Sequence, residues 1–278
     1  MRVKKRLTIT LPPDLLAEID RMIDKQTVRN RSHAIELLLR KSLKPTVSTA
    51  VLLAGGSRSV EQLPALLPIQ GRPLIVQTIE HLKAYGIRSF IILAGQNEPL
   101  VREVLGSGSI KGVEIQYVGE AKPLGTAGAL KVAEPYLTDQ SFLVFHADIL
   151  TDINVADFIK FHAGQNTLAT IAVKPRQAEP DYGKVMLEGS QITDFDPSGQ
   201  DQGISMINTG VYLFEPELLT LIGEEANTML ETDIFPILAR MGELSAFPFQ
   251  GIWFDISRAK NYESAQVRWQ QREGSSHE

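Results

Sequence analysis

The sequence of 278 residues contains no cysteine. This absence excludes disulfide bonds, a thiol nucleophile and zinc sites built on sulfur. The five histidines are scattered, which argues against a dedicated metal site built on imidazoles. No apolar run reaches the roughly 18 residues needed to span a bilayer, and the charged N-terminus lacks the apolar core of a signal peptide. We therefore expect a soluble, cytoplasmic protein without membrane contact.

Charge is distributed unevenly along the chain. Residues 1–46 hold 11 Lys and Arg against 5 Asp and Glu, a net charge of +6, whereas the remainder holds 17 against 28, a net of −11. A small basic segment on an acidic body indicates an anionic partner for the segment alone. The total length suffices for one large or two unequal domains with a substantial core.

The basic segment begins with an alternating pattern. Residues 5–11 place Leu7, Ile9 and Leu11 on one face of a predicted strand, opposite three polar residues. Pro12 and Pro13 end this strand and suit a helix start. The spacing predicts an amphipathic helix over 13–25 and a second helix capped by Asn30. One strand and two short helices bury too little apolar surface to be stable alone, so we expect pairing with a second copy.

This strand-helix-helix order resembles the ribbon-helix-helix family of DNA-binding domains over about residues 3–44. The resemblance implies a two-stranded ribbon in the major groove of DNA, in a homodimer whose further pairing into tetramers stays open. It assigns base contacts to the outward residues of the strand and phosphate contacts to the start of the second helix. The implied DNA-binding residues are Lys4, Arg6, Thr8, Thr10, Asn30, Arg31 and Ser32. A dimerisation arm with solvated charges is the alternative, and residues 25–29 lack a glycine between the helices.

A proline-bearing hinge over 44–48 separates two predicted domains, 1–45 and 46–278. After it, the pattern predicts an α/β fold with a Rossmann-like mixed sheet flanked by helices. The predicted strands are 49–54, 88–94, 113–118, 140–146, 167–173, 183–187, 191–195, 207–213 and 244–254. The predicted helices are 73–85, 97–105, 126–134, 154–164, 215–222, 231–241 and 258–271.

Several residues of this domain suit ligand binding by their position. The strand from Val51 runs into Gly55 and Gly56, where backbone can approach a phosphate. Asp148 ends an apolar strand, where a carboxylate is costly without a cation or a capping role. Asp255 is equally suited to a metal or to capping the last helix. His146, on an apolar strand, is interpreted as a core histidine rather than a base.

Four motifs in order, over about residues 48–270, resemble the sugar-phosphate nucleotidyltransferases. They are the stretch 52–56, Glu120 with 123–130, the strand 142–148, and 208–210 with 253–256. The resemblance implies transfer of a nucleotide from a nucleoside triphosphate to a sugar 1-phosphate. The implied nucleotide or sugar contacts are Ala54, Gly55, Gly56, Glu120, Gly125, Thr126, Asn208 and Thr209. Asp148 and Asp255 would bind Mg²⁺.

The sequence departs from that family where catalysis needs cations. The loop after Gly56 is shorter by about six residues than the family pattern and lacks its lysine, because Pro64 and Ala65 stand there. Arg58 and Lys184 are the remaining catalytic candidates. Phosphoryl transfer depends on positioned positive charge, so we expect impaired catalysis. The first hypothesis is a DNA-binding regulator whose body binds a nucleotide, sugar phosphate or nucleotide sugar. An active enzyme is the alternative, and a purely structural protein is the third.

Overall fold

The computed structural model describes residues 8–23, 28–42, 47–55, 63–106, 112–119, 123–177, 182–198, 203–223 and 227–275. The chain divides into two compact units, Met1–Pro45 and Thr46–Glu278. We call the first the head and the second the body, and describe each by itself. Within the described residues, no helix is both long and apolar enough to cross a membrane.

The head consists of two helices, α1 (Pro13–Arg21) and α2 (Arg31–Ser42). Proline opens α1, where its missing N–H costs nothing. Ile19 of α1 and Ala34 of α2 are buried. Residues 8–11, the described part of the predicted strand, form no strand in this single chain. A ribbon needs a second strand to pair with, which a single copy does not supply.

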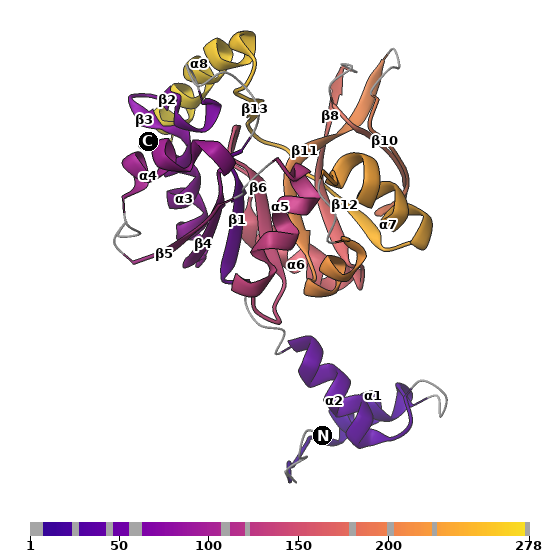
Figure 1. The fold of residues 1–278 in the computed structure, drawn as a ribbon. Coiled ribbons are helices and arrows are strands. Elements are labelled where there is room, and N and C mark those ends of the chain that lie inside the picture. The colour runs from indigo at the N-terminus through magenta and orange to yellow at the C-terminus, as the bar shows by residue number, and fades with distance from the viewer. Residues whose placement is uncertain are drawn as a thin grey trace. The chain divides into compact units, whose positions relative to one another are not determined.

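A nine-stranded sheet forms the centre of the body (Figure 1). Its order is β5-β4-β1-β6-β11-β8-β12-β10-β9. The first four strands are parallel and the second half is mixed, as predicted. The bounds are β1 Thr49–Leu53, β4 Ser89–Leu93, β5 Glu114–Val118, β6 Phe142–His146, β8 Ala169–Gln177, β9 Lys184–Glu188, β10 Gln191–Asp196, β11 Ile204–Phe214 and β12 Leu244–Pro248.

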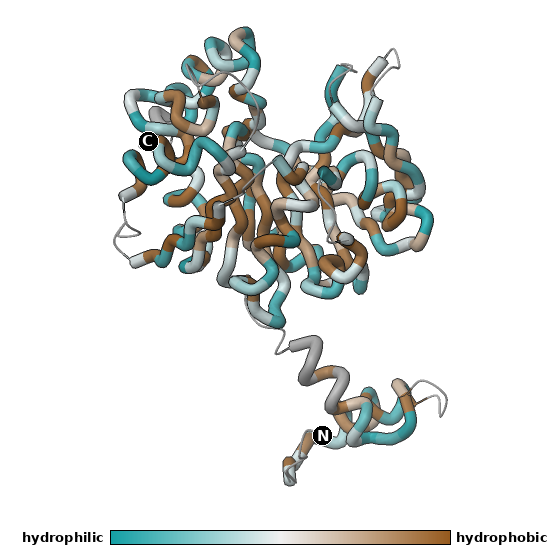
Figure 2. Tube along the Cα trace, in the orientation of Figure 1, coloured by the Kyte–Doolittle hydropathy of each residue, from teal (hydrophilic) through white to brown (hydrophobic). Residues whose placement is uncertain are grey.

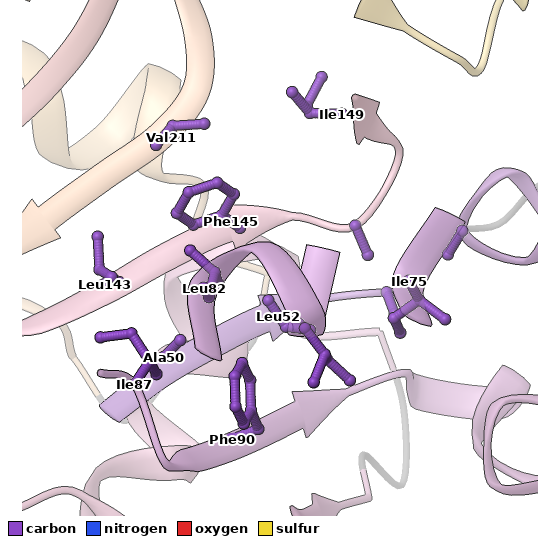
Figure 3. Packing of buried hydrophobic residues seen from close by; sticks show 14 of the residues in the cluster. Ala50, Leu52, Ile75, Leu82, Ile87, Phe90, Leu143, Phe145, Ile149 and Val211 are labelled. Atoms are coloured by element: carbon purple, nitrogen blue, oxygen red, sulfur yellow. The ribbon is translucent and has the colours of Figure 1, made fainter. Parts of the chain in front are cut away.

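Helices cover both faces of this sheet, and its central strands are accordingly mostly apolar (Figure 2). On one face, Leu52, Phe90 and Phe145 pack with side chains of α3, among them Ile75 and Leu82 (Figure 3). Residues of α4 and α6 join this cluster, whereas those of α5 and α7 belong to the cluster on the other face. The bounds are α3 Leu74–Ala84, α4 Glu98–Leu105, α5 Gly125–Ala133, α6 Val155–Gln165 and α7 Phe235–Met241.

A smaller apolar cluster gathers Ile69, Leu150, Ile256 and Trp269. It joins a hairpin to a two-stranded sheet and to the last helix. These elements are β2 Pro68–Ile69, β3 Arg72–Pro73, β7 Ile149–Thr151, β13 Trp253–Asp255 and α8 Ala259–Ser275. The side chains of Tyr262 and Gln266 on α8 donate hydrogen bonds to the carbonyl of Pro68, at 2.7 Å each.

Two predicted elements of the body were wrong in detail, and three short strands were not predicted. The predicted strand 244–254 is two strands, β12 and β13, which belong to different sheets. Strand β7, which pairs with β13, and the hairpin of β2 and β3 were not predicted, because strands of two or three residues carry no periodic signal. The predicted helix 215–222 is a 3₁₀ turn, Pro216–Leu221.

Candidate functional site

A cleft of about 510 Å³ opens at the carboxyl ends of the parallel strands. Leu53 of β1 lies in register with Leu93 of β4 and with His146 of β6, so the residues that follow these strands reach the same edge. Ligands in open α/β sheets bind at this edge. The described lining residues are Leu53, Ala54, Gly55, Leu63, Pro64, Ala65, Leu93, Gly95, Gln96, Pro123, Leu124, Gly125, Thr126, Ala129, His146, Ala147, Asp148, Asn227 and Met229.

Five of the residues predicted from the sequence therefore meet in one cleft. They are Ala54, Gly55, Gly125, Thr126 and Asp148. Gly56, Arg58 and Glu120, predicted for the same site, lie outside the described residues.

Gly125 has a structural reason to be glycine. Its φ is +75°, and a Cβ there would lie 2.4 Å from the carbonyl oxygen of Thr228. Gly55 differs, because a Cβ there would meet protein atoms at 3.7 Å or more, an ordinary contact. The protein itself thus requires glycine at position 125, whereas position 55 leaves room beside the cleft.

The segment around Thr228 is hydrogen-bonded to the start of α5. The carbonyl of Thr228 accepts hydrogen bonds from the amides of Ala127, at 3.0 Å, and Gly128, at 3.1 Å. The Thr126 hydroxyl accepts from the amide of Leu230, at 2.8 Å, and donates to Glu231, at 3.0 Å. The hydroxyl of Thr126, predicted as a nucleotide or sugar contact, and the amides of Ala127 and Gly128 therefore hold the 228–231 segment.

His146 is not a core histidine, so that interpretation was wrong. Its side chain is 25% exposed and lines the cleft. Its Nε2 lies 3.4 Å from the Tyr212 hydroxyl and 3.6 Å from Glu231. The signal available in the sequence was its place at the carboxyl end of a strand, two residues before Asp148. Glu231 and Tyr212 carried no such signal, because they reach the site from distant parts of the chain.

Tyr212 is the buried centre of this polar group. Its hydroxyl accepts from the side-chain amide of Asn208 at 3.0 Å and donates to the carboxylate of Glu231 at 3.4 Å. Burial raises the pKa of Tyr212 well above its usual value, and the negative charge of Glu231 adds to the rise. Tyr212 therefore stays a neutral donor that orients its neighbours rather than a base. Asn208, predicted as a sugar contact, thus reaches the cleft only through Tyr212 and His146.

The two predicted metal residues, Asp148 and Asp255, lie close together at the pairing of β7 with β13. Asp255 ends β13 in register with Ile149, the residue after Asp148. The amide of Ile256 donates to the carbonyl of Asp148 at 2.8 Å. Asp148 lines the cleft, whereas the carboxylate of Asp255 accepts from the amide of Ser257 at 2.9 Å, as in an Asx turn that precedes α8. No group of three His, Asp or Glu residues suited to a metal occurs in the described part of the chain.

Two further predicted residues are buried away from the cleft lining. The Thr209 hydroxyl donates to the carbonyl of Ala172 at 2.6 Å, and the Thr209 carbonyl accepts from the Trp253 indole at 2.9 Å. Lys184, 6% exposed, lies on β9 in register with Asp196. The pKa of Asp196 is lowered, first by hydrogen bonds from Ser198 and then by the charge of Lys184.

In the head, Asn30 caps α2 as predicted, since its side chain accepts from the amide of His33 at 3.0 Å. Arg31 instead forms a two-pronged ion pair with Asp20 of α1, at 2.6 and 2.7 Å. This pair lowers the pKa of Asp20 through the hydrogen bond from Arg31. Thr8, Thr10 and Ser32 are exposed, and Lys4 and Arg6 lie outside the described residues.

Comparison with known proteins identifies both units. The nucleotidyl transferase family model matches residues 49–272, and the ribbon-helix-helix protein, copG family, model matches residues 5–44. A mannose-1-phosphate guanylyltransferase catalytic subunit beta from Danio rerio is 33% identical over 202 residues, 71% of this chain and 56% of that protein. The corresponding protein of Dictyostelium discoideum is 30% identical over 223 residues, 77% of this chain and 62% of that protein. The chain therefore spans little more than half the length of these relatives.

Solved structures show the same fold. HddC from Yersinia pseudotuberculosis has a TM-score of 0.70 at 22% identity, over 80% of this chain and all of that one. A second structure of HddC holds GMP-PN. A UDP-glucose pyrophosphorylase complexed with UDP-glucose has a TM-score of 0.68 at 18% identity, over 81% of this chain and 99% of that one. The chain belongs to the nucleotidyl transferase family and carries a ribbon-helix-helix domain at its N-terminus.

Proposed function

We propose that this protein is a DNA-binding regulator whose body binds a nucleotide, a sugar phosphate or a nucleotide sugar and has little catalytic activity. The observation that carries the proposal is the fusion of a ribbon-helix-helix domain to a nucleotidyl transferase domain in one chain. Enzymes need no DNA-binding domain for turnover, whereas a sensor needs both a ligand site and an output.

The ligand site is the cleft at the ends of the parallel strands. Its volume of about 510 Å³ lies within the usual range for small-molecule sites. Backbone and apolar side chains dominate the described lining, and its polar side chains are Gln96, Thr126, His146, Asp148 and Asn227. HddC holds a guanine nucleotide analogue in the same fold, which supports a nucleotide-type ligand here.

The described lining of the cleft supports the proposal of weak catalysis. Among its described lining residues, the charged or titratable side chains are Asp148 and His146, and none is Lys or Arg. Two amides at the start of α5 already bind the carbonyl of Thr228. Transfer of a nucleotidyl group depends on donors and cations placed around the phosphates. A ligand can bind such a cleft in its ground state without being turned over.

Regulation requires that the ligand prefer one state of the DNA-binding dimer. The 228–231 segment crosses the start of α5 and supplies Glu231 to the cleft group, so a bound ligand changes the contacts that hold it. A ligand with equal affinity for both states would change nothing. The homodimer, its possible tetramer and the cytoplasmic location are part of this proposal.

The alternative function is an active sugar-1-phosphate nucleotidyltransferase with the head as a dimerisation device. The identity of 33% to a mannose-1-phosphate guanylyltransferase favours it. Such an enzyme would use Mg²⁺ to neutralise charge at the reacting phosphate, held by Asp148 and Asp255. Asp148 fits this role at the cleft. Asp255 does not fit, because its two carboxylate oxygens already face the amide of Ser257, the Tyr182 hydroxyl and Arg258. The catalytic roles of Arg58 and Lys184 belong to this alternative.

One pair of assays separates the two functions. The full chain is incubated with Mg²⁺, each nucleoside triphosphate and mannose 1-phosphate or glucose 1-phosphate, and pyrophosphate release is measured. We expect none above the level of Asp148→Ala. In parallel, DNA fragments selected from a random pool are titrated with and without GDP-mannose, UDP-glucose and GTP. A change in DNA affinity with one nucleotide supports the regulator, whereas turnover together with absent DNA binding rejects it.

A further inference from the structure

Asp255 is surrounded by hydrogen-bond donors of its own chain. Its Oδ1 accepts from the Ser257 amide at 2.9 Å. Its Oδ2 lies 3.4 Å from the Tyr182 hydroxyl, which donates to it, and 3.6 Å from Nε of Arg258. The side chain is 14% exposed. A carboxylate this buried needs a positive partner, and the chain supplies one.

Arg258 is held in place rather than extended into solvent. Its guanidinium carbon lies 4.2 Å from the ring centroid of Tyr182, an arrangement that favours a cation. Tyr182 packs edge-on against Trp253, with centroids 5.4 Å apart. The side-chain amide of Asn261 donates to the Tyr182 hydroxyl at 3.3 Å and to the backbone carbonyl of Asp255 at 3.0 Å. Arg258 therefore stands over a fixed aromatic surface beside Asp255.

Other cations lie around this group. Arg176 donates to the carbonyl of Trp253 at 3.0 Å, and its guanidinium carbon lies 5.1 Å from the Trp253 ring centroid. Lys174, two residues along β8, donates to the carbonyl of Gly251 at 2.8 Å. Burial lowers the pKa of Lys174, and the neighbouring charge of Arg176 lowers it further. The positive charges of Lys174 and Arg176 repel each other, and they also repel a divalent cation.

We propose that Arg258 is the built-in counter-ion of Asp255 and takes the place of a divalent cation there, so that the body binds its ligand without a metal at this residue. The proposal rests on the ligand-binding function proposed above. It differs from the two-aspartate metal site that the sequence suggests. Asp148 keeps its place in the cleft, while Asp255 serves to fix Arg258, Tyr182 and the start of α8.

The experiment titrates the full chain with Mn²⁺, followed by water-proton relaxation and by calorimetry. Wild type is expected to show no binding that Asp255→Asn removes. Arg258→Gln exposes the carboxylate and is expected to gain a Mn²⁺ site at Asp255, at least about tenfold tighter than the detection limit set by wild type, since a neighbouring positive charge is lost. The double variant Arg258→Gln/Asp255→Asn is expected to lose that gain. Circular dichroism confirms that each variant is folded.

Arg272→Gln is the matched control. Arg272 lies on α8, with its guanidinium carbon 4.7 Å from the Trp269 ring centroid and its Nε 3.5 Å from Asp152. Like Arg258, it is therefore an arginine over an aromatic ring and beside a carboxylate. It is expected to leave Mn²⁺ binding unchanged. Wild-type Mn²⁺ binding that depends on Asp255, no gain in Arg258→Gln, or an equal gain in Arg272→Gln would each overturn the proposal.

A second measurement keeps this proposal distinct from the proposed function. Binding of GDP-mannose, UDP-glucose and GTP is measured in EDTA and in Mg²⁺. We expect the affinity for the nucleotide to agree within about twofold in the two conditions, because Arg258, and not a metal ion, neutralises the charge of Asp255. Binding that requires Mg²⁺ and is lost in Asp255→Asn overturns the metal-independent site and leaves the sensor intact. If no nucleotide binds in either condition, the ligand-sensing function fails, and the Mn²⁺ titration still decides the role of Arg258.

Discussion

The two units of this protein bury their apolar residues in different ways. In the body, Phe90, Phe145 and Leu52 are fully buried between the sheet and α3. In the head, Ile9, Leu15 and Met22 are 47%, 42% and 38% exposed, while Ile19 and Ala34 are the buried hydrophobic residues among those described. A core of this size makes the body self-sufficient, whereas two short helices cannot be.

The difference teaches where each unit gets its stability. The body closes its core with segments far apart in the sequence, such as β1 and β6. The head leaves an apolar surface that a second copy would cover, in agreement with the ribbon-helix-helix match. If a second copy covers this surface, as we propose, the stability of the head depends on protein concentration. The predictions below test this contrast, from the largest expected effect to the smallest.

The largest effect is expected from Phe145→Ala. Removing a fully buried aromatic ring should lower the free energy of unfolding of the body by about 3–5 kcal/mol. Both tryptophans, Trp253 and Trp269, belong to the body, so fluorescence during urea unfolding reports on it alone. Ile9→Ala in the head is the control and should leave this transition in place. Equal shifts for the two variants would contradict the independence of the units.

Gly125→Ala should follow in size. The left-handed φ alone costs about 1–2 kcal/mol for a residue with a Cβ, and the Cβ would meet the Thr228 carbonyl at 2.4 Å. We expect a loss of about 3 kcal/mol in urea unfolding, together with weaker nucleotide binding, because the 228–231 segment must move. Gly71→Ala is the matched control, with φ +76° and no atom within 4 Å of its Cβ. It should cost only the backbone term of about 1 kcal/mol.

Some features of the body and head could be predicted from the sequence and others could not. The parallel strands were predictable because Leu52 and its neighbours form short apolar runs between helical patterns. Asp148 was predictable from its place at a strand end. The close approach of Gly125 to Thr228 was not predictable, since it joins residues about a hundred positions apart. The pairing of Arg31 with Asp20 was equally hidden, because Arg31 also suited a phosphate.

Leu15→Lys tests the exposed apolar surface of the head. The charge should prevent burial against a second copy, so the molar mass from light scattering should fall to that of the monomer at micromolar concentration. The fluorescence-detected unfolding of the body should be unchanged. Val267→Lys, on the exposed face of α8 in the body, is the control and should leave the oligomeric state unaltered. A monomer in wild type would reject the dimer, and dissociation by Val267→Lys alone would place the interface on the body.

The smallest effect concerns Asp20, whose ion pair with Arg31 is exposed. The pKa of Asp20 is lowered in the folded head, so the pair contributes stability above the unfolded pKa and loses it as pH falls through the folded value. At neutral pH, Asp20→Asn should free Arg31 to reach a DNA phosphate. DNA binding should then tighten several-fold, and the slope of log affinity against log salt should steepen by about one. Asp14→Asn changes the net charge equally without releasing an arginine, so it should strengthen binding without changing this slope. If both variants behave alike, the gain is general attraction, and Arg31 serves only to join α1 to α2.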